Sequence, residues 1–144
     1  MNGLSLIMIR THQLEALRDF YSQIGLSFEQ HKHGKGPIHY AAALDDSGAI
    51  FEIYPLSKKD TKVDTTIRLG FFVEALDDKI ESLSQAKLSI HVQPKMQPWG
   101  YNAVVLDPDG RKVELTQKIR FDTKLVSNPI IETVYNLNIK KVTD

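Results

Sequence analysis

The 144-residue sequence predicts an α+β fold in which two tandem βαβββ modules form a curved, mostly antiparallel sheet around a cavity. Three observations predict this fold. Segments with strand and helix character occur twice in the same order, over about residues 4–55 and about 66–117. One constant shift of 62 residues carries Leu14 onto Leu76 and Glu52 onto Glu114, as expected of a duplication. With 42% hydrophobic residues, the chain can also bury a core without disulfides or structural metals.

Module 1 begins with a β-rich segment and continues with apolar residues at helical spacing. The predicted helix buries Leu14, Leu17, Tyr21 and Ile24 on one face and ends at Gly25. Residues 31–37 are rich in Gly and Pro and predict a loop, and residues 45–48 predict a hairpin turn. The strands are expected at Leu4–Arg10, Leu26–Gln30, Ile38–Leu44 and Ala49–Pro55.

Module 2 follows a polar linker, residues 56–65, and repeats the pattern. Its helix carries Leu76, Ile80 and Leu83, and a loop ends at Gly100. Residues 107–110 predict a β-turn, which also accounts for their likeness to part of a calcium loop. The strands are expected at Thr66–Val73, Leu88–Gln93, Tyr101–Leu106 and Arg111–Gln117.

Composition excludes several classes of protein. Lys plus Arg and Asp plus Glu both total 18, so no net charge favours nucleic acid or an anionic membrane as a partner. The absence of cysteine removes thiol catalysis, thiolate metal sites and disulfides. No apolar run suits a signal peptide or a membrane span, so we expect a cytoplasmic location.

Strand alternation places both glutamates on the sheet face opposite the helices. In the last strand of module 1, Glu52 and Tyr54 share a face, whereas Phe51 and Ile53 point to the helix side. Glu114 occupies the equivalent position in module 2. We therefore expect the two carboxylates to line one cavity, together with Leu6 and Met8 from the first strand and with Arg68 and Phe72 from the fifth.

The sequence resembles the vicinal oxygen chelate superfamily of glyoxalases, bleomycin-resistance proteins and extradiol dioxygenases. The resemblance covers roughly residues 4–117. Three motifs carry most of it, namely Leu17–Tyr21 followed by Ile24–Leu26, Phe51–Pro55, and Asp107–Leu115. Arg68–Phe71 and Pro98–Gly100 add to it.

The resemblance implies four metal-ligand positions, which correspond here to Leu6, Glu52, Arg68 and Glu114. A hydrocarbon and a guanidinium cannot ligate a cation, so the usual metal centre is predicted to be incomplete. We expect no cofactor, although the sequence leaves a divalent metal open. Arg68 between the two glutamates would form either a structural ion pair or a polar ligand anchor, and one glutamate could act as a base.

Further candidates each have a structural alternative. His39 could line the cleft as a proton shuttle or only hydrogen-bond its strand, and Tyr54 could contact ligand or cap the sheet. Trp99 could stack on a planar ligand or pack at a loop base. His31 and His33 lie in a loop with two lysines, and we interpret them as solvated rather than as metal ligands.

Three functions remain after these exclusions. The first is metal-independent binding of a small organic molecule, as in the drug-sequestering members of the superfamily. The second is a lyase, isomerase or dioxygenase that uses a divergent metal site or Glu52 and Glu114 as acid and base. A structural protein with a vestigial cavity is a third. Residues 119–144 are an apolar-containing extension expected to pack on residues 1–118 or on the partner of a homodimer, which the resemblance implies.

Overall fold

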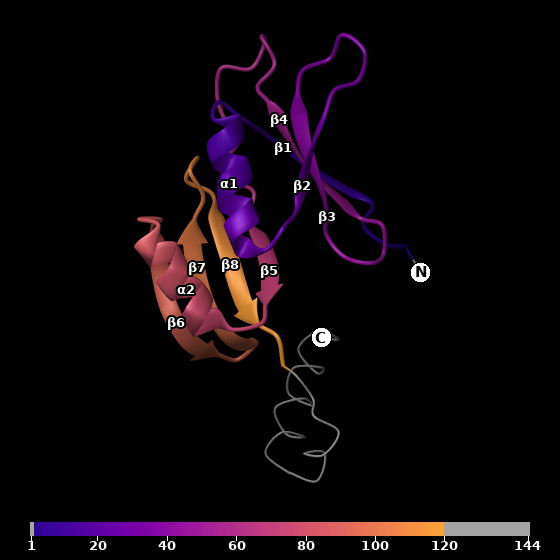
Figure 1. The fold of residues 1–144 in the computed structure, drawn as a ribbon. Helices are drawn as coiled ribbons and strands as arrows, with labels where there is room; N and C mark the ends of the chain where they lie inside the picture. Colours follow the sequence, from indigo (N-terminus) through magenta and orange to yellow (C-terminus); the bar gives the residue numbers. More distant parts are fainter. Residues whose placement is uncertain (1, 120–144) are drawn as a thin grey trace. The chain divides into compact units, whose positions relative to one another are not determined.

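The computed structural model describes residues 2–119, which contain eight strands and two helices (Figure 1). The C-terminal extension therefore lies almost wholly outside the described residues. In chain order the elements are β1 (Leu6–Thr11), α1 (Leu14–Ile24), β2 (Phe28–His31), β3 (His39–Ala43), β4 (Ile50–Pro55), β5 (Leu69–Val73), α2 (Leu76–Gln85), β6 (Ile90–Gln97), β7 (Gly100–Leu106) and β8 (Lys112–Gln117). The predicted duplicated βαβββ order is confirmed.

Each module forms its own four-stranded sheet. The strand orders are β1-β4-β3-β2 and β5-β8-β7-β6, so both sheets have the same connectivity. In the first sheet β1 pairs with β4 in parallel, and the other strand pairs are antiparallel. The chain divides into two compact units: residues 2–69 with Leu106–Val113, and residues 70–105 with 114–119.

The core of the first unit lies between α1 and one face of its sheet. Leu17 and Tyr21 from α1 are fully buried, as are Phe51 and Ile53 from β4. The Tyr21 and Phe51 rings meet edge to face at 5.0 Å. Full burial of a side chain such as Phe51 stabilises the fold by about 1.5–3 kcal/mol. The buried residues of α1 recur at helical spacing, and those of β4 alternate along the strand. Both elements therefore present their apolar side chains to the same interface.

The turn at residues 107–110 packs with the first unit, although it lies between two strands of module 2. Arg111 is buried and donates through Nη1 to Asp107 at 3.1 Å and to Asp109 at 2.7 Å. Tyr21 donates its hydroxyl hydrogen to Asp107 at 2.9 Å. Burial raises the pKa of the Tyr21 phenol, and the neighbouring Asp107 carboxylate raises it further. These contacts connect the turn to α1.

Two strand boundaries differ from the sequence prediction by more than two residues. β6 continues to Gln97, through the segment predicted as a loop, and its pairing with β7 contains register shifts on both sides of Val92. β5 begins at Leu69 rather than Thr66, because the Asp64 side chain accepts hydrogen bonds from the backbone and hydroxyl of Thr66. Within residues 2–119 neither helix has the length and apolar character to cross a membrane.

Candidate functional site

The first sheet has one face covered by α1 and an opposite face that we call the helix-free face. Strand register places the side chains of this face in rows, because partners in adjacent strands point the same way. One row runs from Glu29 through Ala41 and Glu52 to Met8, across β2, β3, β4 and β1. The predicted orientation of Glu52 opposite the helix is confirmed by its buried neighbours Phe51 and Ile53 on the α1 side.

A second row on the helix-free face contains His31, His39, Tyr54 and Arg10. The register pairs His31 with His39 and Arg10 with Tyr54. The His39 and Tyr54 rings stack with centroids 4.1 Å apart and planes 13° apart. The Arg10 guanidinium lies 5.5 Å from the Tyr54 ring centroid and donates to the Pro55 carbonyl at 3.0 Å. His39 and Tyr54 therefore form a stacked pair rather than two separate side chains.

His39 is the most constrained residue of this row. Only 1% of it is exposed, and its Nδ1 lies 3.2 Å from the carbonyl oxygen of Pro37. A carbonyl can only accept, so Nδ1 is the donor, and in the neutral imidazole Nε2 then carries the lone pair. This Nε2 is buried and has no hydrogen-bond partner among the described residues.

The structure brings two further histidines to His39. A ring nitrogen of His31, one of His33 and one of His39 all lie within 4.8 Å of one another. The sequence pattern predicts that His31 and His33 lie in a solvated loop, and that His39 is a separate strand residue. Their proximity follows from the β2–β3 register, since His31 and His39 end and begin these two strands.

Leu6 and Met8 provide the apolar part of the helix-free face, together with Ile50. Leu6 is 49% exposed and Met8 is 40% exposed, although both belong to a strand whose Ile9 is buried. Met8 is the direct strand partner of Glu52. An exposed apolar surface beside a carboxylate suits an organic ligand that has both apolar and polar groups.

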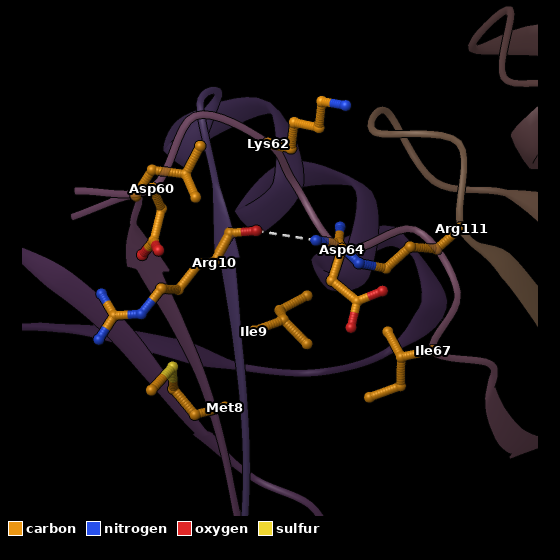
Figure 2. Close-up of a pocket in the computed structure, with 9 residues that line it drawn as sticks. Met8, Ile9, Arg10, Asp60, Lys62, Asp64, Ile67 and Arg111 are labelled. Carbon is orange, nitrogen blue, oxygen red and sulfur yellow. Dashed lines mark hydrogen bonds between the residues drawn. The ribbon is translucent and has the colours of Figure 1, made fainter. Parts of the chain in front are cut away.

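A cavity of about 320 Å³ adjoins this face at the β1 edge (Figure 2). Met8 and Arg10 belong to both the face and the cavity wall. Arg111, which also lines the cavity, donates to the backbone carbonyl of Arg10 at 2.8 Å. The hydrogen bonds from Thr66 lower the pKa of Asp64, and the nearby Arg111 cation lowers it further. The remaining wall residues are Ile9, Leu56, Asp60, Lys62 and Ile67.

The second unit presents an equivalent face around Glu114. A Cβ at Gly70 would stand 3.8 Å from the Cβ of Glu114, so β5 presents Gly70 and Phe72 beside this carboxylate. Phe72 is 71% exposed. Trp99 lies half exposed in the turn between β6 and β7, and Arg68 is exposed immediately before β5. The predicted arrangement of Arg68 between the two glutamates stays a prediction.

Residues 3–115 match the family model of the Glyoxalase/Bleomycin resistance protein/Dioxygenase superfamily. The chain belongs to this superfamily. No curated protein matches the sequence. The matched range contains all of module 1, and module 2 up to Leu115 in β8.

Solved structures of the superfamily fold agree with this assignment. TnmS3, an antibiotic binding protein from Streptomyces sp. CB03234, has 22% identity and a TM-score of 0.64, over 83% of this chain and 98% of that chain. TioX from Micromonospora sp. ML1 has 17% identity and a TM-score of 0.61, over 82% and 100%. A glyoxylase/bleomycin resistance protein/dioxygenase domain from Frankia sp. EAN1pec has 18% identity and a TM-score of 0.59, over 83% and 99%.

The metal centre that the superfamily resemblance implies does not fit the residues at the corresponding positions. Leu6 offers no donor atom, and the Arg68 guanidinium is a permanent cation. Glu52 and Glu114 are the two remaining oxygen donors, one in each unit. Four-coordinate binding at these positions would lack two ligands, so these residues do not form such a centre.

Proposed function

We propose that the protein binds a small, partly apolar organic molecule on the helix-free face of the first sheet. The observation that carries the proposal is the position of Met8. Its exposed side chain is the strand partner of Glu52 and also lines the adjoining cavity. The cavity volume of about 320 Å³ lies at the lower end of the range usual for small-molecule sites.

The face also defines the chemistry of the ligand. Leu6 and Met8 would contact an apolar or aromatic body, and the Glu52 carboxylate would accept hydrogen bonds from an amine or hydroxyl group. Tyr54 would form an aromatic wall, held in place by the buried His39 ring on which it stacks. The similarity in fold to TnmS3, an antibiotic binding protein, supports small-molecule binding in general and leaves the identity of the ligand open.

In the second unit, Phe72, Trp99 and Glu114 are proposed to contact ligand through a face of the same kind. Their support is the exposure of the two aromatic side chains and the place of Gly70 beside Glu114. Arg68, which precedes β5 in the sequence, is proposed as a further ligand contact. A catalytic role for Glu52 and Glu114 as acid and base is the alternative from sequence. A search for product formation in the binding assay tests this alternative.

A thermal-shift screen tests the proposed binding. Purified chain is melted with a panel of aromatic amines and with a matched panel of aromatic carboxylates. We expect amines to raise the melting temperature more than carboxylates do. Glu52→Gln should weaken amine binding by about tenfold or more, because a charge-assisted hydrogen bond contributes about 1.5–3 kcal/mol.

Glu15→Gln on α1 is the matched control, because Glu15 is exposed in the first turn of the helix. This variant should bind the amines like the wild-type chain. Equal stabilisation by the two panels, or equal affinity of the Glu52→Gln and wild-type chains, would refute the assignment of Glu52 as the polar anchor. Conversion of a bound amine to product would establish the enzymatic alternative.

A further inference from the structure

We propose that His31, His33 and His39 form a binding site for one divalent transition-metal ion, with Zn²⁺ as the reference ion. The three residues lie at the end of β2, in the following loop and at the start of β3. They are separate in sequence from the four positions that the superfamily resemblance implies. The site is therefore independent of the incomplete centre at Leu6, Glu52, Arg68 and Glu114.

The His39 imidazole is held in an orientation that suits a metal ligand. The Pro37 carbonyl accepts the Nδ1 proton, and the stacked Tyr54 ring restricts rotation of the imidazole. Protein metal sites commonly orient a ligating histidine in this way, through a carbonyl on its other ring nitrogen. The remaining Nε2 lone pair is buried and has no partner among residues 2–119. Since buried polar atoms normally have a partner, a bound cation accounts for this atom.

His31 and His33 can supply the other two nitrogens. Their positions differ by two at a strand end, and their ring centroids lie 5.8 Å and 5.1 Å from that of His39. The ligand nitrogens of a tetrahedral zinc site with bonds of about 2.0–2.1 Å stand about 3.3 Å apart. In the structure the three ligand nitrogens lie within 4.8 Å of one another. Rotation of the exposed His33 side chain and the half-exposed His31 side chain would shorten these separations to the zinc-site distance.

The donor set selects the class of ion. Imidazole suits Zn²⁺, Cu²⁺, Ni²⁺ and Co²⁺, whereas Mg²⁺ and Ca²⁺ prefer oxygen ligands. The Glu29 carboxylate oxygen Oε2 lies 3.3 Å from Nε2 of His31, and this carboxylate supplies a negative charge at the edge of the cluster. Three protein ligands leave a fourth position for water or a ligand group. Because His39 stacks on Tyr54, this position belongs to the helix-free face of the first sheet.

Calorimetry on the full chain tests the site. The protein is prepared without a polyhistidine tag, stripped with EDTA and titrated with ZnCl₂, and Co²⁺ is then added to record its visible absorption. We expect one Zn²⁺ per chain and a Co²⁺ spectrum of low-coordinate type. His33→Ala should weaken Zn²⁺ binding at least about tenfold, since loss even of an outer-shell partner costs about 10–100-fold.

Controls separate this site from adventitious binding. His91→Ala changes an exposed histidine of the second unit and should leave Zn²⁺ affinity unchanged. His33 is exposed in a loop, so its variant is expected to fold even if the buried His39→Ala variant does not. Zn²⁺ binding that His33→Ala leaves intact, an equal loss in His91→Ala, or the absence of one-to-one binding would each overturn the proposal. Glu52→Gln should not change Zn²⁺ affinity, which keeps this result distinct from the amine-binding test.

Discussion

Replacement of Arg111 by Met should strongly destabilise the first unit. Arg111 and its partners Asp107 and Asp109 have side chains that are 1%, 0% and 3% exposed. The change removes both ion pairs and the hydrogen bond to the Arg10 carbonyl, while the two carboxylates stay buried. Removal of one partner from a buried pair costs about 3–5 kcal/mol. Asp107 keeps the Tyr21 hydroxyl and two backbone N–H donors, which favours the lower end of that range.

Urea unfolding followed by far-UV circular dichroism measures this loss. Arg18→Met is the matched control, because Arg18 is 30% exposed in its ion pair with Asp19, and it should cost about 1 kcal/mol or less. The cost of Arg111→Met should fall in an Asp107→Asn background, since less uncompensated charge then stays buried. A loss of less than about 1 kcal/mol for Arg111→Met would refute the assignment of this cluster as a buried, mutually dependent ion-pair network.

Three further changes test the packing, titration and turn geometry of the first unit. Leu17→Ala, at a fully buried position, should cost about 2–5 kcal/mol in urea unfolding, whereas Leu4→Ala at an exposed position should cost far less. Tyr21→Phe should lower stability by about 1.5–3 kcal/mol near neutral pH. Because the folded pKa of Tyr21 is raised, the unfolded chain loses its proton first, so wild-type stability should fall above about pH 10 and more steeply than in Tyr21→Phe; equal slopes would contradict this. Gly110→Ala should cost about 1–2 kcal/mol, because Gly110 has φ +92°, and an unchanged midpoint would show that the turn relaxes.

Periodicity was sufficient to predict the elements that form the cores. The spacing from Leu14 to Ile24 gives the bounds of α1, and Gly25 ends the helix with φ +133°. Phe51 and Ile53 are buried on the predicted side of β4 because strand alternation leaves only two faces. The orientation of Glu52 follows from the same alternation, so this part of the candidate site was accessible from sequence.

The strand ends depended on local chemistry that periodicity does not describe. Pro94 suggests a loop, yet β6 lies at the edge of its sheet, where a residue without an N–H is tolerated. At the start of β5, the Asp64 side chain bonds to Thr66 and replaces strand pairing there. Both errors lie at element boundaries rather than in the cores.

The duplication that predicts the fold also explains why the histidine cluster could not be predicted from it. Under the 62-residue shift, His31, His33 and His39 correspond to Gln93, Lys95 and Tyr101. The equivalent hairpin of module 2 is also built differently, because β6 reaches Gln97 and a short turn leads to β7 at Gly100.

In module 1 the longer loop of residues 32–38 lets β2 end at His31 and places His33 beside both strands. A comparison of the two halves therefore emphasises what they share, namely the core and the paired glutamates. The imidazoles come together through the β2–β3 register, in which His31 pairs with His39. The proposed metal ligands thus lie in a hairpin where the two modules have diverged.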